Sequence, residues 1–373
     1  MSEVTTSQPP AKNGPVPTSA GRKPRVLVVG VGGIGGVLTA HLARARSEQC
    51  EAIVALSTNE QIVHAIERDG MRVRGSGEPF SVRARVVHEI PKSERPFDLV
   101  LLATQPPQVE DAARKALPFL AADGAMVCLQ NGLCEQRIER IAGPSRVLGA
   151  VVAWGASMLE PGSYERTSSG GFTLGRPDGS DDDRVHTLAS ILDCVGPVKL
   201  TSNLAGVRWS KLAINSAIST LGTLGGDRLG PLLRRTIVRR LALEIMSETV
   251  EVARAEGVRL EKVAGTLDLD WLALTPAERR GALSIALKHA LLIGVGAKYR
   301  RMRSSMLSAI ERGRVPAVDF LNGEVVSHGA ARSVNTPVNA RATERVHALA
   351  RGEAKPGFDQ IEALARDVGL LRA

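Results

Sequence analysis

A glycine-rich segment near the start of the chain carries the most specific chemical signal in the sequence. Gly30-x-Gly32-x-x-Gly35 directly follows the apolar run of residues 25–29 and opens an amphipathic stretch. In that setting the first glycine permits a tight turn, the second admits a pyrophosphate against the backbone, and the third allows close packing of helix on strand. The N–H groups at the helix start then face the anion. The pattern predicts a dinucleotide site rather than a structural turn, made by Gly30, Gly32, Gly33, Ile34 and Gly35.

The tip of the second predicted strand, residues 52–56, indicates which dinucleotide is bound. A site strict for NAD places an Asp or Glu there to accept from the ribose hydroxyl, whereas this chain has Ser57, Thr58 and Asn59 at the tip, with Glu60 close by. These side chains could donate hydrogen bonds to a 2′-phosphate, so we expect NADP(H) in preference to NAD. Thr58 or Asn59 could equally cap the next helix. Thr104, which follows a later strand, is expected to contact the same cofactor.

A lysine and two asparagines are further candidates for chemistry. Lys211 and Asn215 are four residues apart in a helical stretch and therefore share one face. A lysine in a desolvated cleft near other cations has a lowered pKa, which suits it to acid–base work. Taken alone, Lys211 is more typical of a solvated surface lysine. Asn131 precedes Gly132 after an apolar run, where Asn-Gly also favours a simple turn.

The elements that must position these residues follow two patterns along the chain. Strand and helix patterns first alternate at the spacing of βαβ units, which implies a parallel sheet covered by helices. Residues 147–175 are typical of short antiparallel strands, and beyond Thr201-Ser-Asn203 the chain is helical nearly to its end. Strands are expected at residues 25–29, 52–56, 71–74, 82–87, 97–103, 125–129 and 197–200.

The fold class expected from these patterns is α/β, with an N-terminal Rossmann-like doubly wound sheet and a C-terminal all-helical domain. We place the dinucleotide-binding domain at residues 24–201 and a helical substrate or dimerisation domain at residues 202–373. Residues 1–23 are expected to be a disordered extension, because they hold too few apolar groups to offset the entropy of ordering.

Composition narrows the function classes. The chain has 373 residues, of which 43% are hydrophobic and 23% charged, a profile that suits two ordinary globular domains. The net charge of +9 comes from arginines scattered through both halves. A positive cleft for an anionic small molecule explains it better than nucleic-acid binding. No apolar run reaches the roughly 18 residues that a membrane span needs.

The cysteines and the apolar helices bear on location and assembly. Cys50, Cys128, Cys134 and Cys194 lie at no spacing typical of a metal site or a redox pair. Reduced structural thiols and a cytoplasmic location are therefore expected, without a metal site. The stretches 237–252 and 283–293 could pair two copies as a homodimer, or could equally be core.

Several segments together resemble the ketopantoate reductase (2-dehydropantoate 2-reductase) family over residues 25 to about 350. The resemblance implies hydride transfer from NADPH to the keto carbon of a 2-oxo acid in a cleft between the two domains. Lys211 would then be the general acid, with Asn131 near the nicotinamide and the substrate. Asn215 would bind the substrate hydroxyl or carboxylate, and Ser305 would be a carboxylate donor unless it caps a helix. The matching segments are Gly30–Gly35, Gln130-Asn-Gly132, Trp209-Ser-Lys-Leu-Ala-Ile-Asn215, Ser304-Ser-Met306, Val318-Asp-Phe-Leu-Asn-Gly323 and Thr336-Pro-Val-Asn339.

Three departures from the family pattern bear on the substrate. Gln105 stands where the family usually has a lysine, Ala317 where it has an acidic residue, and Ser219 where it has a second substrate-binding asparagine. Gln105 can still form hydrogen bonds but cannot neutralise a carboxylate. Losing a charge contact from a site costs several kcal/mol of binding or transition-state stabilisation. A less anionic or bulkier substrate is expected, with Gln105 and Ser219 still facing it, in a specialised biosynthetic route.

Two other readings stay open from the sequence. Lys211 could serve alcohol oxidation or imine reduction, because the same group gives or takes the proton. Alternatively, the chain could be a non-redox protein that retains a bound dinucleotide as a sensor or as a lyase- or cyclase-like catalyst, which would explain the missing charges at Gln105 and Ala317.

Overall fold

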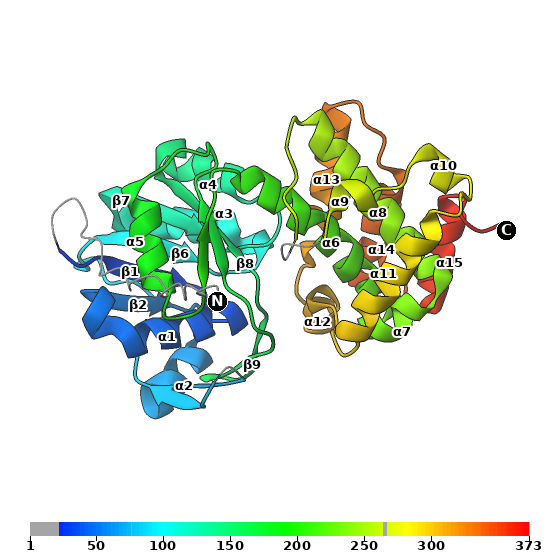
Figure 1. Ribbon diagram of the computed structural model, residues 1–373. Coiled ribbons are helices and arrows are strands. Elements are labelled where there is room, and N and C mark those ends of the chain that lie inside the picture. Colours follow the sequence, from blue (N-terminus) through cyan, green and yellow to red (C-terminus); the bar gives the residue numbers. More distant parts are fainter. Residues whose placement is uncertain (1–21, 76, 264–266, 373) are drawn as a thin grey trace, which may run out of the picture.

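An open eight-stranded sheet forms the first half of the computed structural model, which describes residues 22–75, 77–263 and 267–372 (Figure 1). Most of the predicted extension, residues 1–21, lies outside the described residues. The six strands at the centre and one side of the sheet run parallel, as a doubly wound fold requires. The strands, in spatial order, are β12 (Val198–Leu200), β11 (Phe172–Gly175), β8 (Val147–Val152), β7 (Leu120–Cys128), β6 (Phe97–Leu102), β1 (Arg25–Val29), β2 (Ala52–Leu56) and β5 (Arg85–Val87).

Helices cover both faces of this sheet. Alternate residues of β1 enter different cores, because successive side chains of a strand point to opposite faces. Val26 and Val28 pack with α1 and α5, whereas Leu27 and Val29 pack with α3 and α4. The helices of this half are α1 (Gly33–Gln49), α2 (Glu60–Asp69), α3 (Val109–Ala116), α4 (Glu135–Ala142) and α5 (Asp183–Leu192). The Rossmann-like fold class is thereby confirmed.

A second sheet corrects one predicted strand. Residues 82–87 do not form one strand, because the chain changes sheets at Arg83 and Ala84. Before them the chain pairs antiparallel with β3, and after them it pairs parallel with β2. The second sheet packs against α1. Its strands, in spatial order, are β4 (Phe80–Val82), β3 (Met71–Arg74), β10 (Ser163–Arg166) and β9 (Ala156–Glu160).

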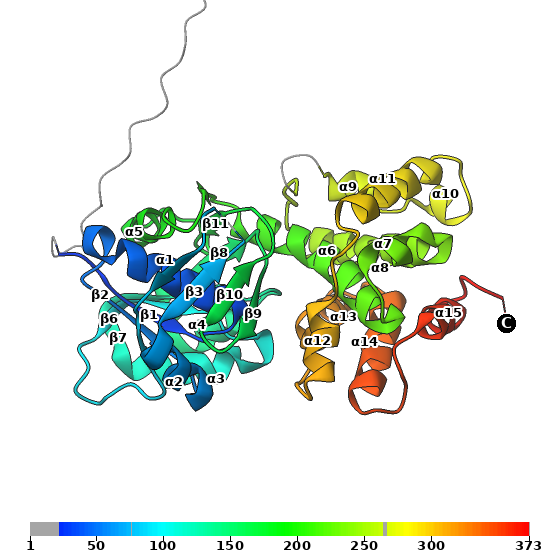
Figure 2. The ribbon, with the colours of Figure 1, turned by 90° about the horizontal axis from the view of Figure 1, so that it is seen from below.

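The second half of the molecule is helical and lies beside the sheet (Figures 1 and 2). The long helices α6 (Leu204–Gly225) and α8 (Thr236–Ala255) pack on each other at its centre. Figure 2 shows α9, α10 and α11 on one side of this pair and α12, α13 and α14 on the other. The remaining helices are α7 (Leu229–Arg234), α9 (Leu269–Leu272), α10 (Pro276–Arg279), α11 (Ile285–Lys298), α12 (Ser305–Glu311), α13 (Asn322–Ala331), α14 (Pro337–Ala350) and α15 (Phe358–Asp367).

The two apolar stretches considered for pairing differ in exposure. Most of α8, which holds residues 237–252, is buried in the helical core and offers little free surface. On or beside α11, by contrast, Leu283, Leu287 and Ile293 are exposed. Within the described parts of the chain, no helix combines the length and the apolar content needed to cross a bilayer.

Candidate functional site

The candidate site lies where the carboxyl ends of the parallel strands meet α6. The chain reverses its direction of winding between β1 and β6, and ligands of open α/β sheets bind outside the strand ends at such a point. Gly30 follows β1, Thr104 lies two residues beyond β6, and Asn131 lies shortly after β7. Val152 ends β8 on the same edge. The strand order therefore brings together residues that are far apart in the sequence.

The glycine-rich loop has the backbone geometry that a pyrophosphate cradle needs. Gly30 has a φ of +98°, and a Cβ there would lie 3.0 Å from the backbone nitrogen of Thr104. A Cβ on Gly35 would collide with the carbonyl oxygen of Gly30, so this glycine allows α1 to start close to β1. A Cβ on Gly32 would meet no atom within 4 Å and would project into open space. The loop thus fits a dinucleotide, with Gly33 and Ile34 opening α1 beside it.

Filling that open space should weaken cofactor binding without harming the fold. We expect Gly32→Ala to raise the dissociation constant of NADPH by at least about tenfold, roughly 1.4 kcal/mol, because the new methyl group takes the place of the phosphates. Fluorescence titration with NADPH measures this, and the melting temperature should stay unchanged. Gly294→Ala is the matched control, since a Cβ there also meets nothing within 4 Å. Unchanged affinity of Gly32→Ala for NADPH would show that this loop does not bind the pyrophosphate.

At the tip of β2, Asn59 caps the next helix, which was one of its two predicted roles. Its side chain accepts from the backbone nitrogens of Gln61 and Ile62 at 2.9 and 3.4 Å, and so caps α2. Thr58 is exposed, and Ser57 is buried at the strand end. These two hydroxyl groups remain the candidates for contact with the ribose end of the cofactor.

Lys211 reaches the sheet edge from α6. Its Nζ donates a hydrogen bond of 2.6 Å to the carbonyl oxygen of Val152, at the end of β8. The residue is partly exposed as a whole, but protein surrounds its charged end. Burial, followed by the nearby Arg208 guanidinium, lowers the pKa of Lys211 to about 7. The side chain is therefore not a solvated surface lysine, and its ammonium gives up a proton near neutral pH.

A buried ion pair joins α6 to the start of α4. Arg208 Nε donates to Glu135 Oε1 at 2.6 Å, and Nη2 lies 2.5 Å from the same oxygen in an ion pair. The same guanidinium donates to the carbonyl oxygens of Gln130 and Cys128 at 2.6 and 2.8 Å. Arg208 therefore holds the chain on both sides of residue 129 and fixes the loop that carries Asn131.

The loop after β7 presents Asn131 at the surface, near the carboxyl ends of the strands. Asn131 is exposed, while Gln130 is buried and donates from Nε2 to Thr104 Oγ1 at 3.2 Å. Gly132 has a φ of +90°, and a Cβ there would collide with the carbonyl oxygen of Phe320. The turn that the sequence offered as an alternative for Asn131 is thus present, and it leaves the amide free to meet a ligand.

The opposite wall of the candidate site is made by α6 and α12. Asn215 is partly exposed and forms no side-chain hydrogen bond within the described part of the chain. Ser304, not Ser305, caps α12, and its Oγ lies 2.9 Å from the carbonyl oxygen of Ser219. Ser305 is exposed at the first position of that helix, one residue beyond this contact. The structure thus places Asn215, Ser219 and the start of α12 along one side of α6.

The departures at Gln105 and Ala317 lie on neighbouring turns. Gln105 is exposed and precedes a short 3₁₀ turn, η1 (Pro106–Gln108). Ala317 begins a second one, η4 (Ala317–Phe320), and η1 packs against η4. Both positions that depart from the family pattern therefore lie on one wall of the molecule.

Other motif residues serve the fold. Asn322 and Asn339 are fully buried and bond to each other at 2.9 Å. Asn339 Nδ2 also donates to Glu248 at 2.7 Å, and Glu248 accepts from the first backbone nitrogens of α14. Burial raises the pKa of Glu248 to about 7. Asn322 and Asn339 therefore hold α6, α8 and α14 together in this structure, and their side chains are used in that packing.

Sequence reasoning missed the residues that tie the two halves together. Besides the Arg208–Glu135 pair, Arg137 of α4 forms an ion pair with Glu324 of α13. The guanidinium carbon of Arg137 also lies 4.8 Å from the centre of the Phe320 ring. Arg208 lies just before Trp209 in a matching segment, which is a weak signal. Nothing local indicates its partner, because the two residues are 73 positions apart.

Two family models match the chain. "Ketopantoate reductase PanE/ApbA" matches residues 26–179, and "Ketopantoate reductase PanE/ApbA C terminal" matches residues 203–350. A 2-dehydropantoate 2-reductase of Pyrococcus horikoshii is 24% identical over 317 residues, which is 84% of this chain and 94% of that protein.

Solved structures share the fold over almost the whole chain. A PanE/ApbA family ketopantoate reductase from Ralstonia eutropha superposes with a TM-score of 0.71 at 25% identity, covering 90% of this chain and 99% of that one. A D-mandelate dehydrogenase, in complex with NADH and anilino(oxo)acetate, gives a TM-score of 0.72 at 20% identity, covering 91% and 99%. The second likeness shows the fold alone.

Proposed function

Because the chain belongs to the ketopantoate reductase family, and is therefore a nicotinamide-dependent oxidoreductase of the CH–OH/C=O couple, we propose that it reduces a 2-oxo acid with NADPH. The D-mandelate dehydrogenase with a bound anilino(oxo)acetate supports an acid whose side chain differs from that of ketopantoate. The departures at Gln105 and Ala317 support the same view.

One observation carries the proposal: the ammonium of Lys211 at the sheet edge. Its Nζ lies 2.6 Å from the end of β8, on the edge where the glycine loop and Asn131 also lie. A group whose pKa is about 7 is well placed to deliver a proton at neutral pH, since it is protonated often enough and gives the proton up easily.

Each residue of the candidate site has its own role in the proposed reaction. A nicotinamide dinucleotide, held at Gly30, Gly32 and Gly35, supplies the hydride when it is bound. Lys211 polarises the keto oxygen and donates the proton that makes it an alcohol. Asn131 and Asn215 have amide groups free to hold the carboxylate or keto oxygen in position, and Ser305 adds a hydroxyl from α12.

For the cofactor we propose NADP(H) over NAD(H). The tip of β2 holds Ser57 and Thr58 and has no carboxylate to accept from an unphosphorylated ribose. Titration of the protein with NADPH and NADH tests this directly. Tighter binding of NADPH is expected, and equal or weaker binding would reverse the assignment.

The proposed reaction is tested by following nicotinamide absorbance. Purified protein with NADPH is given a panel of 2-oxo acids, and cofactor oxidation is expected with at least one of them. Tight binding of NADPH without any oxidation would instead favour a non-redox protein that retains its dinucleotide. Turnover only with alcohols and NADP⁺ would favour the oxidative direction, and turnover only with imines would favour that electrophile.

The pH dependence of the reaction should follow Lys211. Reduction needs the protonated ammonium, so kcat/KM is expected to be halved near pH 7 and to fall tenfold for each further pH unit. Oxidation of the alcohol product needs the neutral amine, so its kcat/KM should rise through the same range. Initial rates measured from pH 5 to 9 in both directions check this, and profiles that are flat from pH 6 to 9 would exclude Lys211 as the proton donor.

Assembly and location remain proposals as well. A homodimer would use the outer face of α11 and the residues just before it, where Leu287 is 64% and Leu283 is 91% exposed. Light scattering in solution distinguishes a dimer from a monomer. The four cysteines are unbridged, which suits a reducing cytoplasm.

A further inference from the structure

Two glycines of the glycine-rich segment are not part of the Gly30-x-Gly32-x-x-Gly35 motif, and the second sheet explains both. A Cβ on Gly33 would collide with the carbonyl oxygen of Ala156, the first residue of β9. A Cβ on Gly36 would collide with the ring of Tyr164 in β10, the strand that pairs with β9. The hairpin of β9 and β10 therefore lies directly against the start of α1.

Tyr164 of this hairpin contacts the centre of the motif. Its side chain is fully buried, and its hydroxyl group donates a hydrogen bond of 3.2 Å to the carbonyl oxygen of Val31. Val31 is the residue between Gly30 and Gly32. Burial raises the pKa of the Tyr164 hydroxyl group above its usual value, so the group keeps its proton and stays a donor.

This contact sets the direction of a backbone donor. A trans peptide group is planar, with its carbonyl oxygen and its N–H on opposite sides. Because the Val31 carbonyl points at Tyr164, the N–H of Gly32 points away from it. Within the described part of the chain, that N–H donates to no protein acceptor. It belongs to the residue on which a Cβ would meet only open space, where the pyrophosphate is proposed to bind.

We propose that Tyr164 is a positioning residue for the dinucleotide, because its hydroxyl group holds the Val31–Gly32 peptide in the orientation that aims the Gly32 N–H at the pyrophosphate. The inference rests on the proposed cofactor site, and it is independent of the substrate and of the direction of the reaction. Without the hydroxyl group this peptide can rotate, since Gly32 adopts many backbone angles. Binding of the cofactor must then order the peptide, which costs affinity.

Removing only the hydroxyl group tests the proposal. Tyr164→Phe keeps the ring beside Gly36, and it is expected to raise the dissociation constants of NADPH and ADP by the same factor, about threefold to tenfold. ADP carries the pyrophosphate without the nicotinamide, so its binding reports on this loop whether or not the protein reduces a 2-oxo acid. Fluorescence titration measures NADPH, and calorimetry measures ADP. Unchanged constants for both, or a change for NADPH alone, would overturn the proposal.

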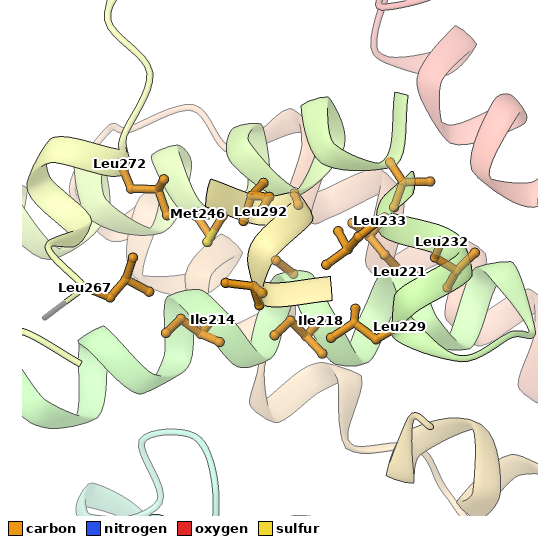
Figure 3. Close-up of a pocket in the computed structure, with 14 residues that line it drawn as sticks. Ile214, Ile218, Leu221, Leu229, Leu232, Leu233, Met246, Leu267, Leu272 and Leu292 are labelled. Atoms are coloured by element: carbon orange, nitrogen blue, oxygen red, sulfur yellow. The ribbon is translucent and has the colours of Figure 1, made fainter. Parts of the chain in front are cut away.

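A variant in the helical half controls for lost stability. An apolar cavity lies there between α6, α7, α8 and α11, and Figure 3 shows its side chains converging on the space. Val238 of α8 is a fully buried member of its lining. Val238→Ala enlarges the cavity, so it should lower the melting temperature at least as much as Tyr164→Phe does. Its dissociation constant for NADPH should stay within about twofold of the wild-type value. An equal loss of affinity in both variants would mean that Tyr164→Phe acts through general stability, against the proposal.

A double variant distinguishes this inference from the cofactor site on which it rests. Tyr164→Phe should add less than about twofold to the dissociation constant of Gly32→Ala for NADPH, because Gly32→Ala has already lost the phosphate contact and the two effects are coupled. Effects that multiply would contradict the proposal. Weaker binding in Gly32→Ala alone would keep the loop as the pyrophosphate site and exclude the role of Tyr164. Wild-type affinity in both single variants would exclude the site and the role together.

Discussion

Replacing Lys211 with methionine is expected to lower kcat/KM for reduction by about a thousandfold, within the 10²–10⁴ that a positioned general acid contributes. Methionine keeps much of the volume of the side chain and removes its proton. Because burial already disfavours the ammonium in the folded protein, removing the charge should not unfold the chain. Steady-state kinetics with the best 2-oxo acid measure the loss.

Two controls belong with this variant. NADPH affinity should stay within about twofold, since the glycine loop rather than Lys211 holds the phosphates. Lys199→Met, on the exposed edge strand β12 two strands from β8, removes an exposed lysine that forms no part of the candidate site and should retain full activity. Full activity in Lys211→Met itself would remove this residue from the proposed mechanism.

Breaking the buried pair between Arg208 and Glu135 is expected to cost the protein about 3–5 kcal/mol of stability. Arg208→Met leaves Glu135 charged, buried and without its main partner, and leaves the carbonyl oxygen of Gln130 without its donor. Chemical denaturation measures the loss. Arg114→Met is the contrasting control, because its ion pair with Glu110 is exposed and should be worth no more than about 1 kcal/mol.

Two further measurements distinguish the pair from general disruption. Adding Glu135→Leu to Arg208→Met should restore much of the stability, since no unpaired charge is then buried. Arg208 also lowers the pKa of Lys211 by charge repulsion, so in Arg208→Met the midpoint of the kcat/KM profile should move to higher pH. A double variant less stable than either single one, together with an unmoved midpoint, would contradict this account.

The Rossmann half was predictable because its signals are local. Each strand is a short apolar run, and the glycine motif sits directly between one of them and its helix. The prediction of a single strand at residues 82–87 was wrong. Two short segments with β propensity follow each other there, and nothing in the local sequence shows that they pair with different sheets. The fold, the family and the enzyme class are confirmed, whereas the roles of Lys211, Asn131, Asn215 and Ser305 stay predictions.

The rest of the site depends on contacts that no local pattern encodes. Arg208 and Glu135 meet across two elements 73 residues apart. Tyr164 reaches Val31 across 133 positions, and nothing beside the glycine motif indicates which side chain contacts it. Ser304 and Ser305 are adjacent and chemically identical, so only the three-dimensional geometry of α12 shows which of them is the cap.

Helix α6 is unbroken from Leu204 to Gly225, and it begins next to the sheet. Lys211 is seven residues from the start of the helix, about 10 Å along its axis, while Gly222 is about 27 Å along it. A small rotation of the helical half about the start of α6 would therefore move Gly222 more than twice as far as Lys211. The contact between Lys211 and the end of β8 is therefore disturbed less by such a rotation than the far end of α6.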